Sequence, residues 1–436
     1  MALNDIDTAG VARILARLLA RPGDHADVYF ERSEIVELPP SGGCPGLRVR
    51  HEDGLAVRLE RGESVWFASA DRIDGQALVD AVRRVARTQP RAMPPDPRLS
   101  IAAPGQVSAD EALGFPSAVR KAVRERQITT PVSLAVKRHR RTVLVVGSQF
   151  ASPVETETFY SVVAQTTAGR WGGLLSALDE TAAAHVARAL ARLNRSRNTA
   201  PPEPWSGPCV LGPEATAVLL HEAVAHALEA DTLALGGHPE AAVGVRLGPA
   251  TIHVLDDPSS APAPVRRTVD DEGVPVLRRW LVRAGVVEQP LCDRAWAASS
   301  DRLAAGAGRR GDRHQPPVPR SHHLELAAGE ASEAELLAGA EGGLYLPAAE
   351  RGSLDPRTGL FRLRFRCAAR IHNRAATTPL GPCELRGQVG DLLPAIDAVG
   401  REVRTAGAGW CAKGGIRVPV WATVPAVRIA GLEVVG

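Results

Sequence analysis

The proline-rich stretch NTAPPEPWSGP, at 198–208, is the feature of this sequence that most constrains the fold. It has no hydrophobic periodicity, and a new apolar run follows it directly. A chain of 436 residues is also too long to form one ordinary hydrophobic core. We therefore predict two domains, at 1–200 and 201–436, with the boundary inside this stretch.

Hydrophobic periodicity predicts alternating helices and hairpins before the boundary. Residues 11–19 carry apolar side chains on one helical face, and the helix is stopped at Pro22-Gly23. DVYFERSEIVEL is strand-like, and the segment after it predicts strands joined at Asp53-Gly54 and at Arg61-Gly62. Further helices are predicted at 76–88, 108–125 and 178–195, with a proline-rich connector at 89–107 and a capping-box pattern of Ser108 with Glu111.

The second half of the chain predicts short strands grouped around one helix. Gly212-Pro213 is a typical helix start, and it precedes the apolar run that contains HEAVAH. The later segments ATIHVLDD, VPVLRRWLVRAGVV, LFRLRFRCAARI and RVPVWATVPAVRIAGLEVV are β-like. Because helices and strands are grouped rather than strictly alternating, we predict an α+β protein. It would have an amino-terminal α/β-hairpin domain and a β-rich carboxy-terminal domain that carries the HExxxH helix.

Charge and composition disfavour several classes of function. The formal net charge is only +3, and the densest basic run, KRHRR at 137–141, is interpreted as a solvated strand edge or turn. We therefore expect no nucleic-acid partner. The sequence contains neither a secretory signal nor an apolar run long enough to cross a membrane, so we expect no membrane association and a cytoplasmic location. GAGRRG at 306–311 satisfies G-x-G-x-x-G, but the sequence after it cannot open a helix, so no dinucleotide site is expected.

The stretch LLHEAVAHALEAD, at 219–231, is the strongest candidate for a chemical site. His221 and His226 are five residues apart, which separates them by roughly 140° on an ideal helix, against roughly 40° for the four-residue spacing of H-E-x-x-H. A π-bulge, which adds one residue to a turn, would bring the two imidazoles together. Glu222 would then lie on the adjoining face. From spacing alone, a metal site and a pair of hydrogen-bonded interior histidines remain equally good explanations.

The six cysteines do not form a disulfide pattern, and no C-x-x-C occurs. Cys367 reads as a buried residue of one strand, whereas Cys44, Cys209 and Cys383 lie in turn-like sequence, and Cys292 has no obvious partner. Cys411, in GAGWCAKGG, stands between glycines.

Two distant segments resemble one known family. HEAVAHALEAD resembles the H-E-x-x-x-H motif of the TldD branch of the TldD/PmbA (TldE) family, which is usually written with glycines, as in HEAVGHGLEGD. The carboxyl end, GWCAKGGIRVPVWATVPAVRIAGLEVVG, is similar to the family pattern C-G-K-x-G-Q-x-x-P-V…P-T-L-x-V-x-x-L-x-V-G. VDDEGVP and GRRGDRHQPPVPR resemble family segments between the two. The resemblance runs across most of 208–436 and more weakly over the first half.

The resemblance implies a zinc metallopeptidase. It implies that His221, His226 and Cys411 bind Zn²⁺ and that Glu222 is the catalytic base. This agrees with the general chemistry of zinc, because three N and S ligands with one open position are typical of a catalytic site. Glu229 and the DDE run at 270–272 are interpreted as supporting or structural.

The sequence also departs from the family pattern. Ala225, Ala227 and Ala230 replace glycines of the helix motif, Ile416 stands where glutamine is usual, and Trp421 where glycine is usual. The ligands are retained, so we predict hydrolysis of unfolded or extended peptides. The replacements lead us to expect an altered cleft wall, and a role in maturing a ribosomally made peptide precursor is a further hypothesis.

The resemblance also implies a dimer, with a TldE/PmbA-like subunit or with a second copy of the chain. The alternative functions are a metal-free, non-catalytic TldE-like partner subunit and a nucleic-acid-associated regulator, since the family was described as gyrase modulators. The intact candidate ligands argue against the first, and the near-neutral charge argues against the second.

Overall fold

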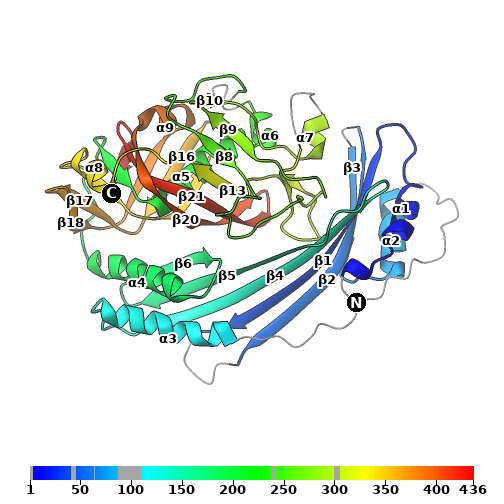
Figure 1. Ribbon diagram of the computed structural model, residues 1–436, viewed down its shortest axis with the longest axis horizontal. Coiled ribbons are helices and arrows are strands. Elements are labelled where there is room, and N and C mark those ends of the chain that lie inside the picture. Colours follow the sequence, from blue (N-terminus) through cyan, green and yellow to red (C-terminus); the bar gives the residue numbers. More distant parts are fainter. Residues whose placement is uncertain (1–2, 41–45, 63, 87–109, 237–241, 299–304) are drawn as a thin grey trace.

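The computed structural model describes residues 3–40, 46–62, 64–86, 110–236, 242–298 and 305–436 (Figure 1). Six strands of the first 175 residues form one long antiparallel sheet, in the order β3-β2-β1-β4-β5-β6. These strands are β1 (His25–Leu38), β2 (Arg48–Arg61), β3 (Ser64–Ala70), β4 (Ser133–Gly147), β5 (Glu155–Thr166) and β6 (Gly169–Leu175). The helices of this part are α1 (Thr8–Leu15), α2 (Gly75–Ala86), α3 (Asp110–Glu125) and α4 (Glu180–Arg195), after a 3-10 turn at Leu3–Asp5.

Successive side chains of each strand point to opposite faces of this sheet, and the two faces contact different parts of the protein. On β1, Val28 and Phe30 pack under α1 and α2, while Leu38 packs under α3 and α4 at the other end of the same face. The residues between them, such as Tyr29 and Glu31, point to the opposite face. Figure 1 shows that the carboxy-terminal half of the chain lies against that opposite face.

The carboxy-terminal half contains a larger mixed sheet and smaller ones. The larger sheet has the order β10-β9-β8-β13-β21-β7-β14-β17-β18, with β20 paired to β21. Its strands are β7 (Cys209–Leu211), β8 (Val254–Asp256), β9 (Arg279–Arg283), β10 (Val286–Val287), β13 (His323–Leu326), β14 (Leu344–Leu346), β17 (Ala368–His372), β18 (Ala375–Leu380), β20 (Ile396–Lys413) and β21 (Ile416–Ile429).

A four-stranded sheet has the order β15-β16-β19-β22, and β11 pairs with β12. These strands are β11 (Gly308–Arg309), β12 (Val318–Pro319), β15 (Ala349–Leu354), β16 (Leu360–Phe365), β19 (Cys383–Gln388) and β22 (Glu433–Val435). The α-helices are α5 (Pro213–Leu220), α6 (Ala230–Leu233), α7 (Arg294–Ala298), α8 (Glu333–Ala338) and α9 (Val389–Ala395). The mixed α and β architecture, rich in strands after residue 208, confirms the predicted fold class. The division at residue 200 stays a prediction.

Several local predictions were wrong. Asp53-Gly54 is not a turn, because β2 runs through it from Arg48 to Arg61. KRHRR is neither a strand edge nor a turn. It lies on β4, which pairs with β1 on one side and β5 on the other, and Lys137, Arg138 and Arg141 form ion pairs with glutamates of those neighbours.

The predicted strand LFRLRFRCAARI is two strands, β16 and β17, which belong to different sheets and meet at buried Cys367. Cys209 and Cys383 are buried strand residues rather than turn residues. Cys44, Ser108 and the connector at 89–107 lie outside the described residues.

A buried network of ion pairs joins the first sheet to the loops of the second half. We call it the ion-pair seam: Asp27, Arg58, Arg141 and Glu157 of the sheet with Arg267, Asp271, Glu272 and Arg310 of the loops. Asp27 contacts Arg58 at 2.6 Å and Arg310 at 3.3 Å. Asp271 contacts Arg267 at 2.9 Å and Arg141 at 3.4 Å. Each carboxylate of the seam therefore has at least one guanidinium beside it.

Candidate metal centre

The helix that carries the HEAVAH stretch changes its winding at the first histidine. Gly212 caps α5 and Pro213 occupies its first turn, as predicted from the sequence. The regular α-helix ends at Leu220, and His221–Ala225 form a π-helical turn in which the backbone N–H of His226 donates to the carbonyl of His221. A 3-10 turn, His226–Leu228, follows, and Glu229 has extended backbone angles. The predicted bulge is confirmed.

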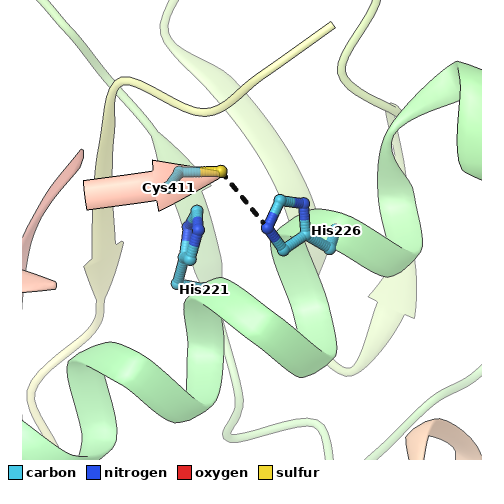
Figure 2. A group of neighbouring side chains, drawn as sticks. All are labelled: His221, His226 and Cys411. Carbon is cyan, nitrogen blue, oxygen red and sulfur yellow. Dashed lines mark hydrogen bonds between the residues drawn. The ribbon is translucent and has the colours of Figure 1, made fainter. Parts of the chain in front are cut away.

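The extra residue in this turn brings the two histidines to the same side of the helix. Their ring centroids are 4.4 Å apart. Both side chains point toward Cys411 in Figure 2, and the Cys411 Sγ lies 3.4 Å from His226 Nε2. One ligand atom from each of the three residues lies within 4.8 Å of the others, and all three residues are buried.

Cys411 reaches the helix from a long hairpin. It lies on β20, opposite Val418 of β21. The hairpin turns at Gly414 and Gly415, whose φ angles of 61° and 80° are left-handed, a conformation that glycine adopts without strain. The sequence showed the glycines around Cys411, but it did not show which helix the hairpin meets.

The three residues fit a zinc ion by their chemistry. Two imidazole nitrogens and one thiol sulfur are the donor types that zinc prefers. His221 Nε2 is buried and has no hydrogen-bond partner among the described residues, which is costly unless the atom binds something else. The other ring nitrogen of His221, Nδ1, lies 3.4 Å from Ser321 Oγ. Burial and the neighbouring His226 lower the pKa of His221 well below its ordinary value, so its imidazole is neutral at pH 7.

A second layer of charged residues orients His226. Its Nδ1 lies 2.9 Å from both carboxylate oxygens of Glu229. Glu229 also accepts from Lys413 Nζ at 2.6 Å and from Arg320 at 3.3 Å. Burial alone would raise the pKa of Glu229, but His226 and the two cations outweigh it and lower that pKa to about 2. A carboxylate held at Nδ1 fixes the orientation of the ring, so that Nε2 of His226 faces Cys411.

Glu222 lies beside the cluster at the wall of a cavity. The cavity has a volume of about 700 Å³, and both His221 and Glu222 line it. Strand β15 passes close to Glu222, since a Cβ atom on Gly352 would lie 2.2 Å from Glu222 Cγ. Burial raises the pKa of Glu222. A carboxylate with a raised pKa next to a cavity is suited to accepting a proton near neutral pH.

The positions that depart from the family pattern do not form the cavity wall. Ala225, Ala227, Ala230, Ile416 and Trp421 are all at most 5% exposed, and the cavity-lining residues include none of them. Ile416 packs beside Cys411, and Trp421 packs behind the wall against Phe159 and Leu174. The expectation of an altered cleft wall stays a prediction, and any effect of these replacements on this cavity would pass through neighbouring residues such as Phe159 and Leu174.

Sequence reasoning identified His221, Glu222, His226 and Cys411, and the structure brings these four together. It did not identify Ser321 or Arg320 as part of the site, although Arg320 ends the segment GRRGDRHQPPVPR that resembles the family. Lys413 was in register with the family pattern, but its contact with Glu229 was not foreseen. The signal for Glu229 was its position three residues after His226 in an apolar run, which predicts contact on a helix.

Comparison with known proteins decides the family. Residues 206–436 match the model described as the PmbA/TldA metallopeptidase C-terminal domain, which is more than half of the chain. The chain belongs to the TldD/PmbA family.

Curated relatives carry names that agree with this assignment. A metalloprotease of Methanothermobacter thermautotrophicus is 31% identical over 243 residues, covering 56% of this chain and 53% of that protein. A zinc metalloprotease TldD homologue of Saccharolobus solfataricus is 26% identical, covering 54% and 53%. The chain thus spans about half the length of these relatives. A metalloprotease TldD homologue of Haemophilus influenzae is 25% identical and aligns over 99% of this chain and 97% of its own length.

Solved structures share the fold of the whole chain. TldE from Thermococcus kodakarensis superposes with a TM-score of 0.74 at 17% identity, covering 98% of this chain and 99% of that one. A putative modulator of a DNA gyrase from Thermotoga maritima superposes with a TM-score of 0.72 at 16% identity, covering 98% and 99%. At these identities the likeness shows the fold alone. Within the part of the chain that the structure describes, no helix is long and apolar enough to cross a membrane.

Proposed function

We propose that this TldD/PmbA-family protein is a zinc metallopeptidase that hydrolyses extended peptides. His221, His226 and Cys411 would hold the zinc, and Glu222 would be the catalytic base. The observation that carries the proposal is the convergence of the three ligand atoms within 4.8 Å, achieved by a π-helical turn beside a cavity. Because a π-turn interrupts a regular helix and is frequent at functional sites, its position between the two histidines supports a ligand role.

Zinc, when bound, would polarise the peptide carbonyl and activate water. The residues of the chain would do the remaining work. Glu222 Oε would accept a proton on the cavity side of the helix and return it to the departing amine. Glu229 would hold the proton of His226 on Nδ1, with Lys413 and Arg320 keeping Glu229 ionised.

The cavity supports an extended chain as the substrate. It lies between the first sheet and the second half of the chain, with residues of β1, β4, β5 and β6 on one wall and of α5, β15 and β20 on the other. A volume of about 700 Å³ accommodates a few residues of an extended peptide and excludes a folded domain. The edge strand β15, which passes beside Glu222, offers backbone groups that an extended peptide could pair with.

We propose a TldE/PmbA-like subunit as the partner in a heterodimer, with a homodimer as the alternative assembly. The support is the family itself and the likeness of the whole chain to a structure named TldE. Maturation of a ribosomally made peptide precursor in the cytoplasm remains a hypothesis about substrate. The competing function is a non-catalytic TldE-like subunit, and the intact ligand set disfavours it.

The deciding experiment measures zinc and peptide hydrolysis together. The full chain, alone and mixed with a TldE-like protein, is analysed for metal by mass spectrometry and incubated with an unstructured peptide. We expect about one zinc per chain, with Cys411→Ser losing most of the metal and all hydrolysis. Cys367→Ser is the matched control, since Cys367 is also buried but lies away from the cluster. Equal zinc content in the wild type and Cys411→Ser would overturn the proposal.

The same protein tests whether the cavity admits extended chains and excludes folded domains. One globular protein is digested in its native form and after irreversible unfolding. Hydrolysis of the unfolded form alone is expected, and equal rates for the two forms would show that the cavity does not control access.

A further inference from the structure

An apolar row lies between two polar rows on the cavity-facing side of the first sheet. Ile35 of β1 lies directly opposite His139 of β4, which in turn lies opposite Phe159 of β5. The His139 and Phe159 rings stack at 4.8 Å with an interplanar angle of 10°. On this face the next row is Ser33, Arg141 and Glu157, and the row beyond Ile35 is Glu37, Lys137 and Ser161. The apolar row is therefore flanked on both sides by polar rows.

Trp410 closes this row from the other side of the cavity. Its ring meets His139 edge-on at 5.3 Å and Phe159 at 5.5 Å. Trp410 directly precedes the candidate ligand Cys411 on β20. These four residues line the same cavity as His221 and Glu222. We call Ile35, His139, Phe159 and Trp410 the apolar patch of the cavity.

A purely structural role accounts for part of this cluster but not for all of it. Phe159 and Trp421 are 3% and 4% exposed and pack together at 6.2 Å, so they hold the sheet against the hairpin. Ile35, His139 and Trp410 remain only half-buried. Burial lowers the pKa of His139 to about 4, so its ring is uncharged at neutral pH and adds to an apolar surface. Part of this surface is thus left facing the cavity.

We propose that the apolar patch binds one large apolar side chain of the peptide substrate, with Trp410 and Ile35 as the main contacts. This inference rests on the proposed peptidase function and adds a substrate class to it. A peptide lying across the cavity would present alternate side chains to the sheet, and one of them would meet the patch while its backbone passes Glu222. The flanking charged rows would disfavour an apolar side chain at the adjacent positions.

The test uses a set of unstructured peptides that differ at one position only, with phenylalanine or alanine moved along a Gly-Ser background. For the zinc-loaded wild type, with its partner subunit if required, kcat/KM is measured for each pair. We expect one position at which phenylalanine is preferred over alanine by about tenfold or more, since a pocket discriminates apolar groups by this order. Trp410→Ala and Ile35→Ala should both reduce that ratio at the same position, and Trp410→Phe should restore most of it.

A measurement of peptide binding without turnover can distinguish a failure of this inference from a failure of the proposed peptidase function. Calorimetric titration of Glu222→Gln with the same peptides measures the phenylalanine-to-alanine affinity ratio without turnover. The zinc content of each Trp410 variant is checked, because Trp410 adjoins Cys411. Trp280→Ala is the control, since Trp280 is half-buried on β9 and does not line the cavity.

An affinity ratio near one at every position, or a ratio that survives both Trp410→Ala and Ile35→Ala, would overturn the inference. An affinity ratio that depends on the patch, in a protein that cleaves none of the peptides, would uphold the patch and contradict the peptidase.

Discussion

The candidate metal centre and the ion-pair seam are both buried clusters of ionisable side chains, but their charges are balanced differently. In the seam, Asp27 and Asp271 each contact two arginines directly. At the metal centre, His221 Nε2 has no partner among the described residues, and the nearest cations contact Glu229 rather than the ligands. Buried carboxylates with guanidiniums beside them are explained by structure, whereas a buried imidazole nitrogen that has no hydrogen-bond partner and lies near a second imidazole and a thiol calls for a ligand. The difference is consistent with a structural role for the seam and supports the ligand role proposed for the centre.

Among the variants that test this contrast between the centre and the seam, Glu222→Gln is expected to have the largest effect. Glutamine keeps the shape of the side chain but cannot accept a proton, so hydrolysis should fall by roughly 10²–10⁴-fold. Zinc content and stability should stay at wild-type levels, because Glu222 is not a candidate ligand. Glu333→Gln, at an exposed site on α8, is the control. Activity near that of the wild type would mean that another group is the base.

The seam is tested by Arg58→Met. This change leaves Asp27 and Glu272 without their shared guanidinium, and breaking a buried pair costs about 3–5 kcal/mol. Denaturant unfolding should show this loss, while the zinc bound per folded chain should be unchanged. Arg386→Met removes an exposed pair with Glu433 and should have a much smaller effect. A selective loss of zinc in Arg58→Met would erase the distinction between the two clusters.

A smaller effect is expected from Glu229→Gln, which changes the carboxylate that contacts the candidate ligand His226. Losing the carboxylate at His226 Nδ1 should weaken zinc binding by about 10–100-fold in competition with a chelator. Asp231→Asn is matched to it, because Asp231 also contacts Lys413 but, within the described part of the chain, forms no hydrogen bond or ion pair with His226. Equal chelator sensitivity in the two variants would indicate that Glu229 serves only to balance Lys413 and Arg320.

The smallest effect concerns Asp293, a carboxyl near the seam that makes no ion pair within the described part of the chain. Burial and the neighbouring Glu272 raise the pKa of Asp293 to about 7, with Arg58 and Glu60 also acting on it. Because this folded-state pKa is above that of the unfolded chain, the folded protein retains the proton, and stability falls as pH rises from about 4 to 7.

Asp293→Asn removes this pH dependence. Asparagine can still accept from the Trp296 N–H that Asp293 caps. Between pH 5 and pH 8 the variant should gain about 1–3 kcal/mol over the wild type in denaturant unfolding. Asp179→Asn, at the exposed cap of α4, should follow the wild type across the same range. A constant difference between Asp293→Asn and wild type would show that Asp293 is ionised throughout.

The helical part of the candidate site could be predicted because its information is local, whereas Cys411 was linked to it only by the family resemblance. Gly212-Pro213 fixes the start of α5, and the five-residue spacing of His221 and His226 requires the bulge that is found. The packing around the site could not be predicted in this way. KRHRR looked like an exposed edge or turn because the strands that flank it, and the glutamates that contact Lys137, Arg138 and Arg141, come from other parts of the sequence. LFRLRFRCAARI alternates without interruption, so nothing in the pattern reveals that it changes sheets at Cys367.

The position of Cys411 has a consequence for the order of folding. The hairpin that carries it must meet a helix whose His226 lies 185 residues earlier in the chain. Closing so long a loop is entropically unfavourable until both elements are formed and docked, so the three candidate ligands come together only late in folding. Zinc should therefore leave the refolding rate nearly unchanged and slow unfolding instead, since it stabilises contacts that the transition state has not yet made. Bound metal would thus stabilise the completed fold against unfolding without helping the chain to reach it.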